Sequence, residues 1–288
     1  FVLSFLWAAD DGRSRWAYAA PGALLGLTAL FRPEYLPFCI VFAALACLWR
    51  PRSWVPGAIL LAAFALVVAP WTIRNAVELD RFVPISTGGG KALFIGTFLP
   101  GDGDHYATKR YLFYASHPGS DLPPEEVNLL PMQPLLDAVA AQRPDLDRDA
   151  ALGAIGRENL EEAISDEPLD LLAMMGRKVW RMWRSGSGPG MDGAWQAVIH
   201  ALVGLAGLGG LALLAARRRR EAVAIGLLVL GITAIGAVLL ASTRRNLILM
   251  PVVMALGGLA ISWLTADLTS SRPWDRSQPS LPGSSQPS

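Results

Sequence analysis

Six stretches of this sequence are apolar and almost free of charged residues, which restricts the chain to folds built from whole buried or membrane-embedded helices. They cover residues 16–31, 35–49, 54–71, 194–216, 222–241 and 247–264. A helix needs about 17–25 residues to cross the hydrocarbon core of a bilayer. An amphipathic helix would show polar residues at a spacing of 3.6, and these stretches show none. The sequence therefore predicts an all-α, multi-pass membrane protein that forms a helical bundle.

The six stretches differ in how easily they span a bilayer. Residues 194–216 and 222–241 are long enough, 54–71 and 247–264 are just long enough, and 16–31 and 35–49 need their flanks or a tilt. The chain also begins with the apolar run FVLSFLWAA, which lacks the basic residues that open a signal peptide. We expect this run to be the end of a transmembrane helix, and the chain to be the C-terminal part of a longer protein.

Three short arginine-rich connections fall on one side of the predicted membrane when the helices are counted. They contain Arg13 and Arg15, Arg50 and Arg52, and residues 217–220. Because short basic loops stay in the cytoplasm, this side is predicted to be cytoplasmic and the membrane to be the inner (plasma) membrane. The other side then receives residues 32–34, 72–193 and 242–246.

This topology divides the chain into four parts. They are transmembrane helices in 1–71, an extracytoplasmic region in 72–193, three transmembrane helices in 194–264, and a disordered cytoplasmic tail in 265–288. The tail is assigned from its Ser/Pro-rich composition.

The extracytoplasmic region is expected to mix a small hairpin with helices. Residues 81–86 and 91–96 flank a Gly-rich turn and are predicted to pair as strands. Residues 100–134, rich in Gly, Pro and Asp, are predicted to be loop. Periodic apolar residues over 147–165 predict a helix, and Pro168 is expected to begin a second one.

The second of these helices is expected to lie in the headgroup layer, because basic and apolar residues separate on its two faces. Leu171, Met175 and Val179 share the apolar face. The basic face carries Arg177, Lys178, Arg181 and Arg184, with Trp180 and Trp183 beside it.

Other motifs give little support for a metal or cofactor. The run from Thr87 to Lys91 resembles a phosphate loop but lacks its first glycine and its final Ser/Thr, so we interpret it as a turn. Asp102 and Asp104 lack the further acidic residues of a calcium loop. The histidines at 105, 117 and 200 show no ligand spacing. We predict no cofactor and no metal, and no nucleic-acid partner.

Two arginines stand where apolar stretches end, Arg32 before Pro33 and Arg74 shortly after Pro70. A guanidinium stays charged at any working pH and is costly to hold near lipid, so it often marks a functional site. It can also extend to the interface as a simple anchor. The nearby prolines favour a functional interpretation, since interrupted helices in membranes line cavities.

Four runs resemble one family of enzymes, the bacterial polyprenyl-phosphate-sugar-dependent glycosyltransferases of the GT-C fold, relatives of protein O-mannosyltransferases and lipid A aminoarabinose transferases. The runs are GALLGLTALFRP (22–33), VAPWTIRN (68–75), FVPISTGG (82–89) and LFIG (93–96). The resemblance implies transfer of a sugar from a polyprenyl-phosphate carrier to an acceptor outside the cytoplasm. It also places the catalytic acid in an outer loop upstream of this chain, so the fragment is expected to lack that residue. Thr97 stands where the family commonly has asparagine.

The residues expected to bind the phosphate of the donor are basic or amide side chains on the outer side. They are Arg32, Arg74, Asn75, Lys91, Arg244 and Arg245. The expected partners are a polyprenyl-phosphate-linked sugar, membrane lipids and a glycan, lipid or protein acceptor. Two alternatives stay open: a transporter or flippase for an anionic lipid, which would use the same arginines without chemistry, and a non-catalytic membrane subunit.

Overall fold

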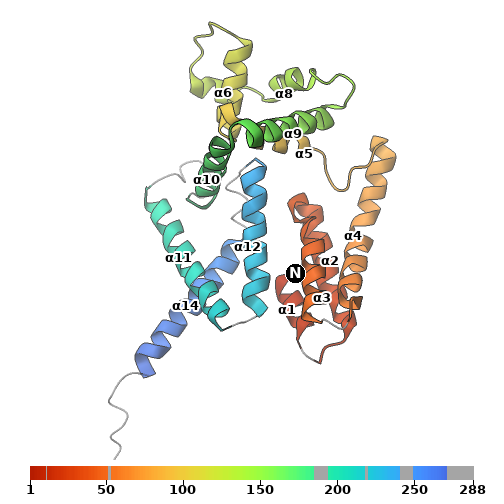
Figure 1. Ribbon diagram of the computed structural model, residues 1–288, viewed down its shortest axis with the longest axis vertical. Helices are drawn as coiled ribbons and strands as arrows, with labels where there is room; N and C mark the ends of the chain where they lie inside the picture. Colours follow the sequence, from red (N-terminus) through yellow and green to blue (C-terminus); the bar gives the residue numbers. More distant parts are fainter. Residues whose placement is uncertain (11, 51–52, 185–193, 218–219, 241–248, 271–288) are drawn as a thin grey trace, which may run out of the picture.

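The computed structural model describes residues 1–10, 12–50, 53–184, 194–217, 220–240 and 249–270 (Figure 1). These residues form helices joined by turns, and no strand occurs among them. The predicted all-α class is therefore confirmed. Apolar helices gather at one end of the molecule, and a unit of shorter helices caps the other (Figure 1).

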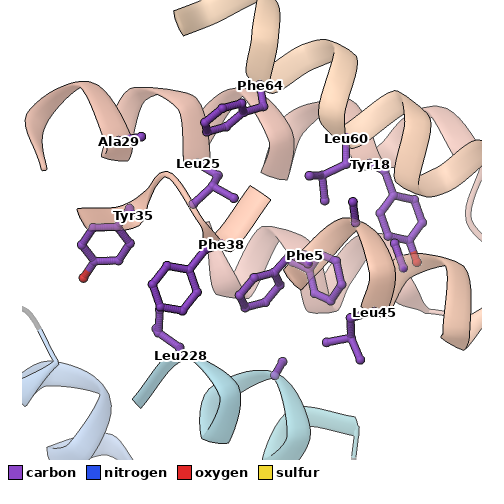
Figure 2. Packing of buried hydrophobic residues seen from close by; sticks show 14 of the residues in the cluster. Phe5, Tyr18, Leu25, Ala29, Tyr35, Phe38, Leu45, Leu60, Phe64 and Leu228 are labelled. Carbon is purple, nitrogen blue, oxygen red and sulfur yellow. The ribbon is translucent and has the colours of Figure 1, made fainter. Parts of the chain in front are cut away.

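The N-terminal apolar group comprises α1 (Val2–Ala9), α2 (Ala19–Phe31), α3 (Phe38–Trp49) and α4 (Val55–Leu79), with the 3₁₀ helices η1 (Arg15–Tyr18) and η2 (Pro33–Tyr35). Its core is rich in aromatic rings, and Figure 2 shows Phe5, Phe38 and Leu60 packed together. Leu228 joins this core from a helix near the C-terminus.

Two glycines one turn apart let α2 approach α4 closely. A Cβ atom added at Gly22 would lie 2.3 Å from the carbonyl oxygen of Leu60, and one at Gly26 would lie 3.1 Å from that of Phe64. Small residues spaced by four are typical of helices that pack backbone to backbone in membranes. The spacing of Gly22 and Gly26 thus fixes the α2–α4 crossing.

Helix α4 runs through Pro70 and ends only at Leu79. The predicted interruption at Pro70 is therefore wrong, whereas α2 does end just before Arg32 and Pro33. A proline removes one helical hydrogen bond, but contacts made by the residues that follow it favour continuing the helix. The expected boundary at residue 71 consequently falls inside a helix, and Arg74 lies on that helix.

The α5–α10 unit, residues 89–184, follows α4. It contains α5 (Gly89–Thr97), η3 (Leu99–Gly101), α6 (His105–Ser116), α7 (Pro124–Leu129), α8 (Gln133–Ala140), α9 (Arg148–Asp166) and α10 (Pro168–Arg184). The helices predicted over 147–165 and from Pro168 are confirmed as α9 and α10. Asp147 begins α9 by accepting from the backbone N–H groups of Asp149 and Ala150.

The predicted hairpin is wrong, because residues 89–97 form α5. The apolar run 91–96 does not alternate, and such a run fits a buried helix as well as a strand. Gly90 favours the helix by letting α5 pack closely on α9, since a Cβ at this position would lie 1.8 Å from the backbone oxygen of Asp149. Thr97 strengthens the same pairing, since its hydroxyl lies 2.9 Å from the carbonyl oxygen of Gly156.

The loop predicted over 100–134 is also wrong, since it contains α6, α7 and the start of α8. Asp104 begins α6, where its Oδ1 accepts from the backbone N–H groups of Tyr106 (3.0 Å) and Ala107 (2.9 Å). An aspartate is a strong N-cap, and the Gly and Pro content of the segment hid this signal.

The C-terminal apolar group comprises α11 (Ala194–Ala216), α12 (Arg220–Val238) and α14 (Met250–Ser270). Helices α11 and α14 meet at glycines, since a Cβ at Gly210 would lie 2.0 Å from the carbonyl oxygen of Leu256. Within the described ranges, three helical stretches are long and apolar enough to cross a bilayer: Val55–Leu79, Ala197–Ala216 and Arg220–Val238. Pro33–Trp49 and Met250–Trp263 are apolar but shorter.

The described residues Arg13, Arg50 and Arg220, one from each basic connection, lie at the same end of the apolar helices, as predicted. Arg50 donates to the carbonyl oxygens of Asp10 (2.9 Å) and Arg13 (3.2 Å), and Arg220 donates to that of Ala9 (3.2 Å). These bonds join the ends of α1, α3 and α12 at the pole opposite the α5–α10 unit (Figure 1). The cytoplasmic location of this end stays a prediction.

Candidate functional site

Arg32 lies between α2 and η2 and has an extended backbone conformation. Its guanidinium forms an ion pair with Glu34 at 3.3 Å, and the two side chains are 37% and 15% exposed. The chain thus already supplies one anion to Arg32. A phosphate bound here would have to share the guanidinium with Glu34.

Three side chains of the PWTIRN run hold the segment that follows α4. The indole N–H of Trp71 donates to the carbonyl oxygen of Ile85 at 2.7 Å, and the Thr72 hydroxyl lies 2.7 Å from that of Pro84. The buried amide of Asn75 donates to the carbonyl oxygens of Val83 (3.2 Å) and Ile85 (2.9 Å).

These bonds satisfy backbone acceptors that a buried segment could not leave unpaired. The amide nitrogen of Asn75 is committed to the chain's own backbone, and its predicted role in binding substrate stays a prediction.

Arg74 projects from the same turn of α4 but is exposed. Its guanidinium carbon lies 5.1 Å from the centre of the Trp71 ring, and its Nη1 donates to Asn75 Oδ1 at 3.4 Å. No carboxylate among the described residues pairs with it. A guanidinium stacked on an aromatic ring and open to solvent is suited to binding an anion.

Lys91 lies in the first turn of α5, where its backbone N–H donates to Asp149 Oδ1 at 3.3 Å. Its ammonium lies close enough to Lys109 and His105 for its charge to act on both. Burial lowers the pKa of His105, and the positive charges of Lys91 and Lys109 lower it further. Lys109 donates to the carbonyl oxygens of Asn128 (2.9 Å) and Leu130 (2.8 Å), so its bonds are made within the chain.

Among the predicted site residues that the structure describes, Arg74 contacts its neighbour Asn75, but Arg32, Arg74 and Lys91 are not brought into contact with one another. No hydrogen bond or ion pair in the described part of the chain joins Arg32, Arg74 and Lys91. Arg244 and Arg245 lie outside the described residues, so their predicted approach to Arg32 or Arg74 stays a prediction.

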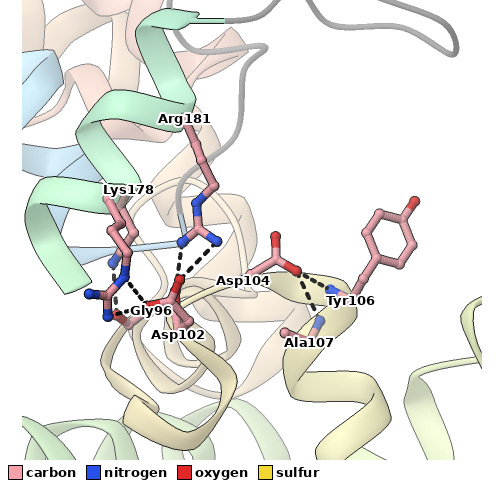
Figure 3. A network of polar contacts seen from close by, with 8 residues as sticks. Gly96, Asp102, Asp104, Tyr106, Ala107, Lys178 and Arg181 are labelled. Carbon is pink, nitrogen blue, oxygen red and sulfur yellow. Dashed lines mark hydrogen bonds and ion pairs between the residues drawn. The ribbon is translucent and has the colours of Figure 1, made fainter. Parts of the chain in front are cut away.

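Sequence reasoning missed a polar network between η3 and α10 (Figure 3). Asp102, at a positive φ of 50°, accepts from Arg177 Nε (2.9 Å) and Nη2 (2.7 Å) on one carboxylate oxygen. Arg181 pairs with the other oxygen at 3.1 Å and donates to the Asp102 carbonyl oxygen at 2.7 Å. Bidentate arginine pairs fix geometry as well as charge, so this network orients α10 on η3.

Both carboxylates that were considered as metal ligands have other partners in the structure. Asp102 is held by two arginines, and Asp104 begins α6. No cluster of three His, Cys, Asp or Glu residues suitable for a metal occurs among the described residues.

Lys178 was predicted on the basic face of α10, and this is wrong: its side chain is fully buried. The ammonium donates to the carbonyl oxygens of Gly96 (2.7 Å) and Val238 (3.2 Å), in the last turns of α5 and α12. Helix C-termini carry unpaired carbonyls and partial negative charge, which stabilises a buried ammonium. The signal was in the sequence, because the buried residues 171, 174, 178 and 182 follow helical spacing.

Comparison with known proteins found no matching family model, no matching curated protein and no matching solved structure.

Proposed function

We propose that this chain belongs to an integral-membrane, GT-C-type glycosyltransferase of the inner membrane, which transfers a sugar from a polyprenyl-phosphate carrier to an extracytoplasmic acceptor. The four resembling runs between residues 22 and 96 support this proposal. The three helices of spanning length and the gathering of basic connections at one pole are consistent with it.

The proposal rests on the different contacts of the side chains in the PWTIRN run. Trp71 and Asn75 are bonded to the segment after α4, while Arg74 between them is exposed and lacks a carboxylate partner among the described residues. A leaving polyprenyl phosphate needs a cation to stabilise its charge in the transition state. Arg74 supplies such a group at the end of α4 that lies toward the α5–α10 unit (Figure 1).

The test measures sugar transfer by the full-length protein in membranes supplied with a panel of polyprenyl-phosphate-linked sugars. A charge-assisted hydrogen bond contributes about 1.5–3 kcal/mol, so Arg74→Ala should lower transfer by about 10- to 100-fold. Arg74→Lys should recover part of it, because a lysine keeps the charge but loses the bidentate geometry.

Arg157→Ala is the matched control, since Arg157 is an exposed arginine on α9 outside the proposed site. If Arg74→Ala transfers sugar as fast as the parent, Arg74 is only an interfacial anchor. Movement of the labelled carrier between leaflets without transfer to any acceptor would favour the transporter alternative.

A further inference from the structure

A cavity of about 520 Å³ lies between α10, α11, α12 and α14. Such a volume is within the range of about 300–1,000 Å³ that small-molecule sites occupy. Its walls are mainly aliphatic. Helix α11 contributes Ala197, His200, Ala201, Gly204, Leu205, Gly207, Leu208 and Leu211, and the remaining lining residues are Trp180, Trp183, Arg184, Val229, Thr233, Val253 and Leu256.

The cavity is long and has one polar end. Its α11 lining runs from Ala197 to Leu211, about 21 Å along the helix axis at 1.5 Å per residue. Arg184 ends α10 at one extreme, one turn from Trp180, and His200 lies near the same end of α11. Leu208 and Leu211 lie at the other extreme. The shape is that of an extended chain with a polar head.

The walls are held in place by contacts that do not involve a ligand. Trp183 Nε1 donates to Thr233 Oγ1 at 3.3 Å, and the Thr233 hydroxyl donates to the carbonyl oxygen of Val229 at 2.7 Å. On the opposite wall, Gly207 packs against Val253, where a Cβ would come within 2.5 Å. These contacts fix the spacing of α10 from α12 and of α11 from α14.

The polar end is suited to an anion. The cavity lining contains Arg184 and no carboxylate. Arg184 forms no ion pair with another described residue. His200 lines the same end of the cavity; its Nδ1 atom is buried and has no hydrogen-bond partner among the described residues.

We propose that this cavity binds one anionic membrane phospholipid, with an acyl chain lying along α11 and the phosphate at Arg184. Leu205 and Leu208 line the cavity and are 67% and 62% exposed, so it opens onto the outer surface of the apolar helices. An acyl chain can therefore enter from the bilayer. The site is separate from Arg32, Arg74 and Lys91, and it does not depend on sugar transfer.

The test uses phosphatidylglycerol with a photoactivatable diazirine on one acyl chain, added to the full-length protein in lipid nanodiscs. Label should map to α11 peptides between residues 197 and 211. Gly204 lines the cavity and a Cβ there would meet nothing within 4 Å, so Gly204→Leu fills the cavity with little strain. We expect it to lower labelling about tenfold, equivalent to displacing about two methylene groups. Ala201→Leu is a second filling variant.

Gly226→Leu is the matched control, since Gly226 lies on α12 outside the cavity and also has open space around it. It should label like the parent. Arg184→Gln should abolish the preference for phosphatidylglycerol over phosphatidylcholine, while Arg157→Gln should leave it unchanged. Undiminished labelling in both filling variants would overturn the proposal. Displacement of the probe by undecaprenyl phosphate but not by unlabelled phosphatidylglycerol would overturn the assignment to a phospholipid.

Discussion

The buried ammonium of Lys178 joins the α5–α10 unit to the end of α12, and replacing it with methionine tests how strongly it holds them together. Methionine keeps the unbranched stem, which packs so closely beside Gly103 that a Cβ there would lie 2.7 Å from Lys178 Cδ. It removes the donors to the carbonyl oxygens of Gly96 and Val238. The change therefore isolates the charge and its hydrogen bonds from the packing.

The expected loss follows from two opposing effects. Hydrogen bonds to a charged group contribute about 1.5–3 kcal/mol each, so the two bonds give about 3–6 kcal/mol. Removing the buried charge returns part of this, because an ammonium is costly to desolvate. We expect the free energy of unfolding to fall by about 2–3 kcal/mol, which corresponds to a drop in Tm of about 3–5 °C for a chain of this size.

The assay is thermal unfolding of the purified full-length protein followed by tryptophan fluorescence, with hydrogen exchange as a local readout. Amides near residues 92–97 and 236–240 should exchange faster in Lys178→Met than in the parent. Arg157→Met is the control and should unfold like the parent, because Arg157 is exposed. If Lys178→Met unfolds at the parent temperature with unchanged exchange, the carbonyl contacts of Lys178 do not stabilise the junction.

Two further predictions concern packing and topology. Gly22→Val should lower the free energy of unfolding by about 1–3 kcal/mol, an amount typical of overpacking, because its Cβ would meet the Leu60 carbonyl oxygen at 2.3 Å. Gly226→Val, where a Cβ meets nothing within 4 Å, should not unfold at a lower temperature than the parent, since valine forms helix at least as readily as glycine. Single cysteines at Ser53 and Ser120, in a background without Cys39 and Cys47, should react differently with an impermeant thiol reagent on intact cells: position 120 should label and position 53 should not, and the reverse pattern would invert the proposed orientation.

Local signals were sufficient to predict some elements of this fold. Helices α9 and α10 follow from an aspartate N-cap, a proline in a first turn and apolar periodicity, which all act within a few residues. The grouping of the three basic connections followed from counting apolar stretches. Each of these predictions depended on neighbours in the sequence, and each was confirmed.

Contacts between distant residues decided where prediction failed. Residues 91–96 form a helix because Gly90 and Gly156 let α5 lie against the backbone of α9. The Thr97–Gly156 hydrogen bond between these helices joins residues 59 positions apart in the sequence. The Asp102–Arg177 pair spans 75 residues, and the Lys178–Gly96 bond spans 82. The helical spacing of Lys178 with the buried residues of α10 indicates the face on which it lies, but nothing local in the sequence indicates its carbonyl partners.

The contacts of the basic residues indicate which of them can contribute most to the proposed anion site. Lys178 and Lys109 donate to backbone carbonyls, and Arg177 and Arg181 hold Asp102. Among the predicted site residues that the structure describes, Arg32 is paired with Glu34. A cation already paired inside the protein gives up part of that interaction when it binds a ligand, and this lowers its net contribution to affinity. By this argument Arg74 and Lys91 should contribute more to phosphate binding than Arg32, and Glu34→Gln should strengthen binding at Arg32 if that residue takes part.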